Sequence, residues 1–199
     1  METSKDNIIK AYNIAKETGA DSTSKVLEAL YPELDFTPED NRPVTERIKT
    51  FEDACAALGE DHLYVQMFRD IYNTSEKAGA TVNSDVVAYL KLRIITAALN
   101  EGWEPQFTED EDRWYPWFFL WTADELAERD AKWKRNNCLI STQDYRGEWA
   151  GLASAYSSDA PSYSGAYIGS RLCFKSNTLA EYAGKQFIDL WMDFYLIRK

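Results

Sequence analysis

The sequence predicts an α+β fold, with a helical N-terminal region over residues 1–80 and a compact, strand-containing domain over residues 81–199. In the first eighty residues, apolar side chains recur at helical spacing and are separated by short polar breaks. After Gly102, short aromatic runs typical of strands replace this pattern. The chain then ends in an amphipathic stripe, which predicts a closing C-terminal helix.

Caps and breakers divide the N-terminal region into short helices. One face of the first expected helix, residues 6–17, carries Ile8, Ile9, Tyr12 and Ala15. Thr50 with Asp53 predicts an N-terminal cap before a helix that Gly59 ends. Further helices are expected over 23–31 and over 61–73, the latter with a stripe of Leu63, Met67 and Ile71. The proline-containing residues 32–44 predict a loop.

The strongest helical pattern begins at Ser84, the expected N-cap, and runs to about Asn100. Its apolar stripe consists of Val86, Leu90, Ile94 and Ala97, widened by Ile95 and Leu99. Such a wide stripe predicts burial against more than one neighbour.

The second half of the chain predicts strands between helices. Residues 114–121 (WYPWFFLW) are short, aromatic and strand-like, and a polar helix is expected over 122–134. Short strands are expected over 138–142 and 172–174, with a loop between them. The stripe of the closing helix consists of Leu179, Ala183, Phe187, Leu190 or Trp191, and Phe194.

Composition excludes several classes of partner. The chain has 33 acidic and 22 basic residues, a formal net charge of -11. Because phosphate contacts need clustered Lys and Arg, we expect no nucleic-acid partner. No apolar run approaches the roughly 20 residues of a bilayer span, so we expect no membrane insertion. Cys55, Cys138 and Cys173 lack CxxC spacing and favour free thiols, hence a protein that is cytoplasmic when synthesised.

No pattern predicts catalysis, a cofactor or a metal ion. His62 is the only histidine, so catalytic triads and multi-histidine metal sites have at most one member. The cysteines have no base near them in sequence and are expected to be buried thiols. The acidic run at 108–112 lacks the spaced ligands and the glycine of a calcium loop. We therefore expect a protein that is not an enzyme and that holds neither a cofactor nor a metal.

Residues 145–167 (YRGEWAGLASAYSSDAPSYSGAY) differ from the rest of the chain. Tyr, Ser, Ala and Gly make up 17 of these 23 residues, and Lys, Ile, Val and Phe do not occur. Tyr with Ser and Gly is typical of binding loops, because tyrosine offers a large contact area with few torsions to fix. An irregular structural loop is the alternative. We predict a binding surface over 143–167 whose contacts are Tyr145, Trp149, Tyr156, Asp159, Tyr163 and Tyr167.

The run AGLASAYSSDAPSYSGAYIGSRLCF resembles the closing region of C-type-lectin-like domains of the formylglycine-generating-enzyme type. The matching residues are Ala150, Gly151, Ala160, Pro161, Ile168, Gly169, Arg171 and Leu172. The resemblance implies a compact lectin-like domain over 81–199. Ile140-Ser141-Thr142 replaces the usual Arg-Gly-Gly, and neither the catalytic cysteines nor a calcium site has a counterpart.

Three longer stretches, residues 47–59, 98–103 and 169–187, resemble uncharacterised proteins of Bacteroides phages and prophages. Some proteins with the lectin-like ending are variable proteins of diversity-generating retroelements, whose binding loops are rich in Tyr, Ser, Asn, Asp, Ala and Gly. The resemblance implies a non-catalytic ligand- or receptor-binding protein of phage or prophage origin, with a protein or glycan as its target. A structural or assembly protein of a phage particle, in which the segment joins copies of the chain, is the alternative. Association with the virion and homo-oligomers are compatible with both.

Overall fold

The computed structural model describes residues 4–36, 40–79, 82–106, 108, 110–137, 140–141, 149–161 and 170–197, with the backbone alone for residues 76, 140–141, 149–161 and 170. The chain divides into two compact units, Met1–Arg42 and Pro43–Lys199. The division therefore lies within the predicted proline-containing loop and not at residue 80.

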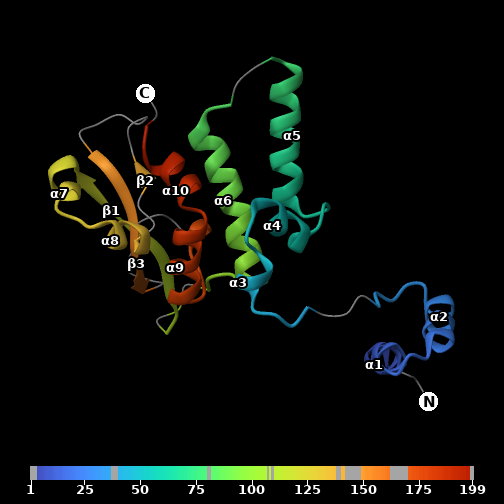
Figure 1. Ribbon diagram of the computed structural model, residues 1–199. Helices are drawn as coiled ribbons and strands as arrows, with labels where there is room; N and C mark the ends of the chain where they lie inside the picture. The colour runs from blue at the N-terminus through green and yellow to red at the C-terminus, as the bar shows by residue number, and fades with distance from the viewer. Residues whose placement is uncertain are drawn as a thin grey trace. The chain divides into compact units, whose positions relative to one another are not determined.

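The first unit is a pair of helices, α1 (Lys5–Glu17) and α2 (Asp21–Leu30) (Figure 1). Ile8, Tyr12 and Ala15 are buried on α1, as the predicted stripe requires. The Tyr12 hydroxyl donates a hydrogen bond of 2.6 Å to Oε1 of Glu28 on α2. Gly19 joins the two helices with a φ of 71°, which favours glycine because it carries no Cβ.

The second unit is built around one long central helix. Its helices before the sheet are α3 (Val44–Arg47), α4 (Phe51–Leu58), α5 (Leu63–Lys77) and α6 (Ser84–Asn100). The predicted cap of α4 is confirmed, since the side chains of Thr50 and Asp53 each accept a hydrogen bond from the other residue's backbone N–H. The helix α6 packs against α4, α5, α9 and α10, which explains its wide apolar surface.

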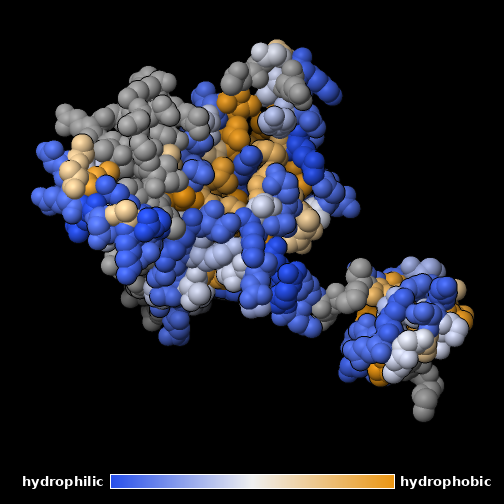
Figure 2. Space-filling view, viewed as in Figure 1, coloured by the Kyte–Doolittle hydropathy of each residue, from blue (hydrophilic) through white to orange (hydrophobic). Residues whose placement is uncertain are grey.

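The predicted stripes on two of these helices are placed differently. Leu63, Met67 and Ile71 are exposed on α5, which instead buries Val65. On α6, Val86 is 41% exposed, whereas Ile94, Ile95 and Leu99 are buried. Figure 2 shows hydrophobic side chains gathered over α5 and α6. Helical periodicity located these helices, but it did not identify the face of α5 or the part of α6 that packs in the core.

A small antiparallel sheet follows α6. Its strands are β1 (Asp112–Thr122), β2 (Ile140–Ser141) and β3 (Trp149–Pro161), in the order β1-β3-β2. The strand β1 lies where the aromatic run predicts it, and it pairs with β3 from Asp112↔Pro161 to Thr122↔Trp149. The register shifts after Trp117 and again after Trp121. On its other edge, β1 forms a single antiparallel bridge between Trp114 and Phe174.

The remaining elements are short. The predicted polar helix is divided into α7 (Ala123–Ala127) and α8 (Ala131–Asn136). Ser170–Leu172 form a 3-10 turn, η1, where a strand was expected over 172–174. The predicted closing helix is two helices, α9 (Asn177–Gln186) and α10 (Ile188–Tyr195), which meet at Phe187.

The prediction of an α+β fold with a compact C-type-lectin-like domain is wrong. The described residues are mainly helical, with ten α-helices beside one three-stranded sheet. One hydrophobic core joins the two halves of the chain, because Val65 of α5 and Leu99 of α6 share it with Phe174 and Trp191. Residues after 80 therefore do not close a core of their own. The lectin-like ending fails at Arg171 and Leu172, which lie in a 3-10 turn and not in a last strand.

Trp191 is the anchor of the closing helices in this core. Its side chain is 0% exposed, and its Nε1 donates a hydrogen bond of 3.2 Å to the Ala183 carbonyl. Replacing Trp191 by Ala should lower the free energy of unfolding by about 3–5 kcal/mol, because the substitution leaves a large cavity. The matched control is Tyr72→Ala on α5, where the side chain is 54% exposed; its effect should stay within about 0.5 kcal/mol. Urea unfolding measures both, and equal midpoints would contradict the assignment of Trp191 to the core.

Candidate functional site

Half of the predicted binding residues lie in the central strand of the sheet. Tyr145, Tyr163 and Tyr167 fall outside the described residues. The other three are on β3, where Trp149 pairs with Thr122, Tyr156 with Trp117 and Asp159 with Trp114. Residues 149–161 are thus a strand that pairs with β1 along its length and with β2 at residues 151–152, whereas a loop was expected between the strands at 138–142 and 172–174.

A row of aromatic rings follows β1 beside this strand. The ring centroids of Trp117 and Phe119 are 4.3 Å apart, and those of Phe119 and Trp121 are 5.5 Å apart. Trp133 of α8 continues the row at 5.1 Å from Trp121. The Arg129 guanidinium lies 5.1 Å from the ring centroids of both Trp121 and Trp133. Trp117 ends the row with 45% of its surface exposed.

On the edge of β1 opposite β3, residues 173–175 form hydrogen bonds on both sides of their backbone. The backbones of Trp114 and Phe174 exchange two hydrogen bonds, of 3.1 and 2.9 Å. On the other side of the segment, Nδ2 of Asn100 donates to the Cys173 carbonyl at 2.8 Å, and the Lys175 N–H donates to Oδ1 of Asn100 at 3.1 Å. The buried Asn100 amide, at the end of α6, therefore acts as a neighbouring strand would.

The contact between the end of α6 and residues 173–175 is called the junction below. Glu101 holds this junction from the surface. It ends α6 in a left-handed conformation with a φ of 50°, a backbone position that is rare outside glycine. Its carboxylate pairs with Nζ of Lys175 at 2.9 Å and with Nη2 of Arg47 at 2.5 Å. The Lys175 hydrogen bond, followed by the charge of Lys175 and that of Arg47, holds the pKa of Glu101 below its ordinary value.

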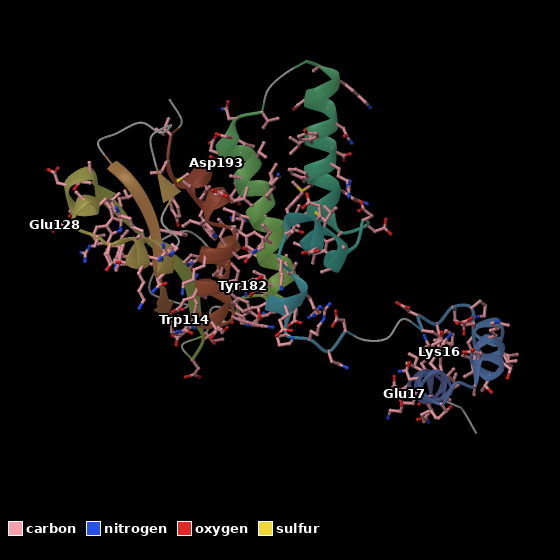
Figure 3. The ribbon with its side chains drawn as sticks, in the orientation of Figure 1. Lys16, Glu17, Trp114, Glu128, Tyr182 and Asp193 are labelled. Atoms are coloured by element: carbon pink, nitrogen blue, oxygen red, sulfur yellow. The ribbon has the colours of Figure 1, made fainter. Side chains whose placement is uncertain are left out.

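Residues 47–59, 98–103 and 169–187 meet at this junction. Arg47, Glu101 and Lys175, one from each stretch, form the ion pairs described above. On α9, the Tyr182 hydroxyl donates a hydrogen bond of 2.6 Å to the Ile48 carbonyl. Figure 3 labels Tyr182 on α9 and Trp114 on β1. Residues far apart in the sequence are thus held together by polar contacts as well as by the core.

A pocket of about 410 Å³ opens beside the junction. Helices α5 and α6 contribute Tyr64, Arg93, Thr96, Ala97 and Asn100. Residues 103–105, with Arg171 and Cys173, complete the wall. Its volume falls within the range of about 300–1,000 Å³ that is usual for small-molecule sites. We therefore regard this pocket as a second candidate site, beside the predicted surface.

Beneath the pocket lies a small buried cluster of Tyr115, Cys173 and Trp103. Burial raises the pKa of the Cys173 thiol to about 11, and the nearby Arg113 opposes this rise. Burial also raises the pKa of the Tyr115 hydroxyl. Cys173 is therefore protonated at neutral pH, and a thiol in that state is a poor nucleophile. The part of the pocket wall formed by Cys173, Thr96 and Asn100 is therefore suited to binding a ligand by shape and hydrogen bonds.

Several other classes of site are not formed by the described part of the chain. Within it, no group of three His, Cys, Asp or Glu side chains could hold a metal ion. The nitrogen Nδ1 of His62 accepts a hydrogen bond of 3.3 Å from the Tyr64 N–H. None of the helices in the described ranges is long and apolar enough to cross a bilayer.

Comparisons with known proteins give no relative from which a function could be transferred: no protein-family model, curated protein or solved structure matches the chain.

The sequence did not indicate this pocket. Its walls come from residues 64, 93–100, 103–105 and 171–173, which no local spacing connects. One signal was present, since Arg93 interrupts an apolar helix (KLRIITAAL) at a position half-buried in the structure. A charged side chain within a buried helix is retained where it has a partner or a role.

The Glu101 ion pairs predict an acid-dependent contribution to stability. A carboxyl whose pKa is lowered on folding stabilises the folded state above its unfolded pKa, and this stability is lost as the pH falls through the folded pKa. Glu101→Gln should therefore lower the free energy of unfolding by about 1 kcal/mol at neutral pH, since these pairs are partly exposed. The difference from wild type should shrink below the ordinary carboxyl pKa of 4.5. Urea unfolding across the acid range measures this, and a constant difference would contradict it.

The buried cysteines Cys55 and Cys173 should resist alkylation in the folded protein. Cys55 and Cys173 are buried, and burial raises the pKa of both thiols. Iodoacetamide at pH near 8 should therefore label both slowly in buffer and rapidly in concentrated urea. Mass-spectrometric peptide mapping follows each cysteine separately. Rapid labelling of Cys173 in buffer would show that the base of the pocket is open to reagents.

Proposed function

We propose that the protein is a non-catalytic binding protein that recognises a protein or glycan target through residues 143–167. The observation that carries the proposal is the position of β3. Thirteen residues of this Tyr/Ser/Gly-rich segment, Trp149–Pro161, form the central strand of the sheet. The segment is therefore fixed at its middle by backbone pairing along β1.

This arrangement separates the tasks of folding and recognition. Backbone hydrogen bonds to β1 depend little on side-chain identity, so Ser, Ala, Gly and Tyr are tolerated in β3. A binding surface carried on a strand is also held more rigidly than one carried on a free loop. Pairing with β1 does not require the unusual composition of the segment. We therefore attribute this composition to recognition.

The aromatic row on β1 supports the same surface. Exposed Trp117 is the register partner of Tyr156, so an aromatic anchor adjoins the segment at the middle of the sheet. Tryptophan and tyrosine dominate the energetics of protein contacts, since each buries a large area and carries a polar group. The resemblance to phage proteins makes a bacterial surface glycan or receptor the expected class of target.

The proposal is tested with the double variant Tyr163→Ser/Tyr167→Ser, whose substitutions lie outside β3. The immobilised protein is probed with a glycan array and with bacterial outer-membrane vesicles. Wild type should retain a probe, and the variant should lose at least about tenfold in affinity, the effect of removing an aromatic hot spot. The matched control, Tyr72→Ser on α5, should bind as wild type does.

Thermal melts and size-exclusion chromatography with light scattering identify the competing explanations. The binding hypothesis requires that the double variant melts within a few degrees of wild type. A badly destabilised variant would instead show that the tyrosines support the fold. If wild type is an oligomer that the double variant dissociates, the segment joins copies of the chain, as in an assembly protein.

A further inference from the structure

The pocket beside the junction contains two arginines, and neither has an acidic partner within the described part of the chain. Arg93 lies on α6 and Arg171 on η1, and both line the wall. None of the ion pairs formed within the described ranges includes either residue. Arg171 is exposed, so its guanidinium is available to a molecule in the pocket. A planar guanidinium with its fork of N–H donors matches the two oxygens of a carboxylate.

Arg93 is held in place by its neighbours. Its guanidinium carbon lies 4.2 Å from the centroid of the Tyr64 ring, a stacking distance. Its Nη1 also donates a hydrogen bond of 3.4 Å to the Tyr89 hydroxyl. Stacking occupies the face of the guanidinium and leaves the remaining N–H donors on its edge. A ligand would therefore meet a charge whose orientation is already fixed, which lowers the entropic cost of binding.

Thr96 adds an unused polar group to the same wall. Its side chain is 4% exposed, and its hydroxyl has no hydrogen-bond partner among the described residues. A buried hydroxyl without a partner is unfavourable, so the position calls for an explanation. An oxygen atom of a ligand in the pocket would supply that partner.

The other walls restrict the size and charge of the ligand. Tyr64 and Trp103 offer aromatic surface, and Ala97 with Pro105 offers apolar surface, for an organic body. Glu104 also lines the pocket, so one negative charge opposes the two arginines. A ligand with a single negative charge balances this set, whereas a second negative charge would be repelled by Glu104.

We infer that this pocket binds a small organic monocarboxylate, with the carboxylate at Arg93 and Arg171 and an aromatic or apolar body against Tyr64 and Trp103. This function is separate from recognition by residues 143–167. It uses binding energy only and requires no chemical step.

The test uses the full chain and three carboxylates, namely benzoate, phenylacetate and indole-3-acetate. Their neutral amides are the matched ligands, and isothermal titration at low ionic strength measures affinity. At least one carboxylate should bind at least about tenfold more tightly than its amide, because the amide carries no charge and has an NH2 donor in place of one acceptor oxygen. Arg171→Gln, at an exposed position, should weaken that binding by about tenfold.

Three further variants complete the design. Arg93→Gln should weaken binding as Arg171→Gln does, and Arg69→Gln, an exposed arginine outside the pocket, should leave it unchanged. Glu104→Gln should strengthen the binding of the dianion phthalate. The inference is overturned if no carboxylate binds better than its amide, or if Arg171→Gln binds as wild type. It is also overturned if inorganic phosphate binds more tightly than all three carboxylates. The Tyr163→Ser/Tyr167→Ser variant should bind the carboxylate normally, so the two proposals succeed or fail separately.

Discussion

The second unit depends on the hydrogen bonding of residues 173–175. This segment bonds to the backbone of Trp114 on one edge and to the Asn100 side chain on the other. Because both groups of the Asn100 amide are used, replacing that residue would leave the buried Cys173 carbonyl and the part-buried Lys175 N–H without partners. A single side chain thus joins the end of α6 to the sheet across more than seventy residues of sequence.

This constraint also positions both candidate sites. On one side, Trp114 pairs with Asp159 of β3, so the bridge to Phe174 holds the strand that supports the predicted binding segment. On the other side, Asn100 and Cys173 form part of the pocket wall. Rigid support of this kind is what a preorganised site requires, because ordering the site after binding would cost affinity.

Local patterns in the sequence predicted α1, α4, α6 and β1, whose signals are short-range caps and periodicity. They failed where tertiary contacts decide. Residues 149–161 lack β-branched side chains, yet they form a strand because the aromatic β1 offers a partner along their whole length. The lectin-like ending was a resemblance over few residues, and Arg171 and Leu172 turn where a strand was expected. The pocket was not predictable from local spacing, since its walls meet only after α6 and η1 have packed.

Arg93 and Arg171 are distinguished by where they lie and not by the lack of an ion pair. The chain has 33 acidic residues against 22 basic ones, yet Arg129 and Arg135 also form no ion pair within the described ranges. What Arg93 and Arg171 share is the wall of one pocket. In the described part of the chain, that wall combines two cations outside any ion pair with the buried Thr96 hydroxyl, which has no hydrogen-bond partner. Such a wall is complementary to an anion supplied from solution.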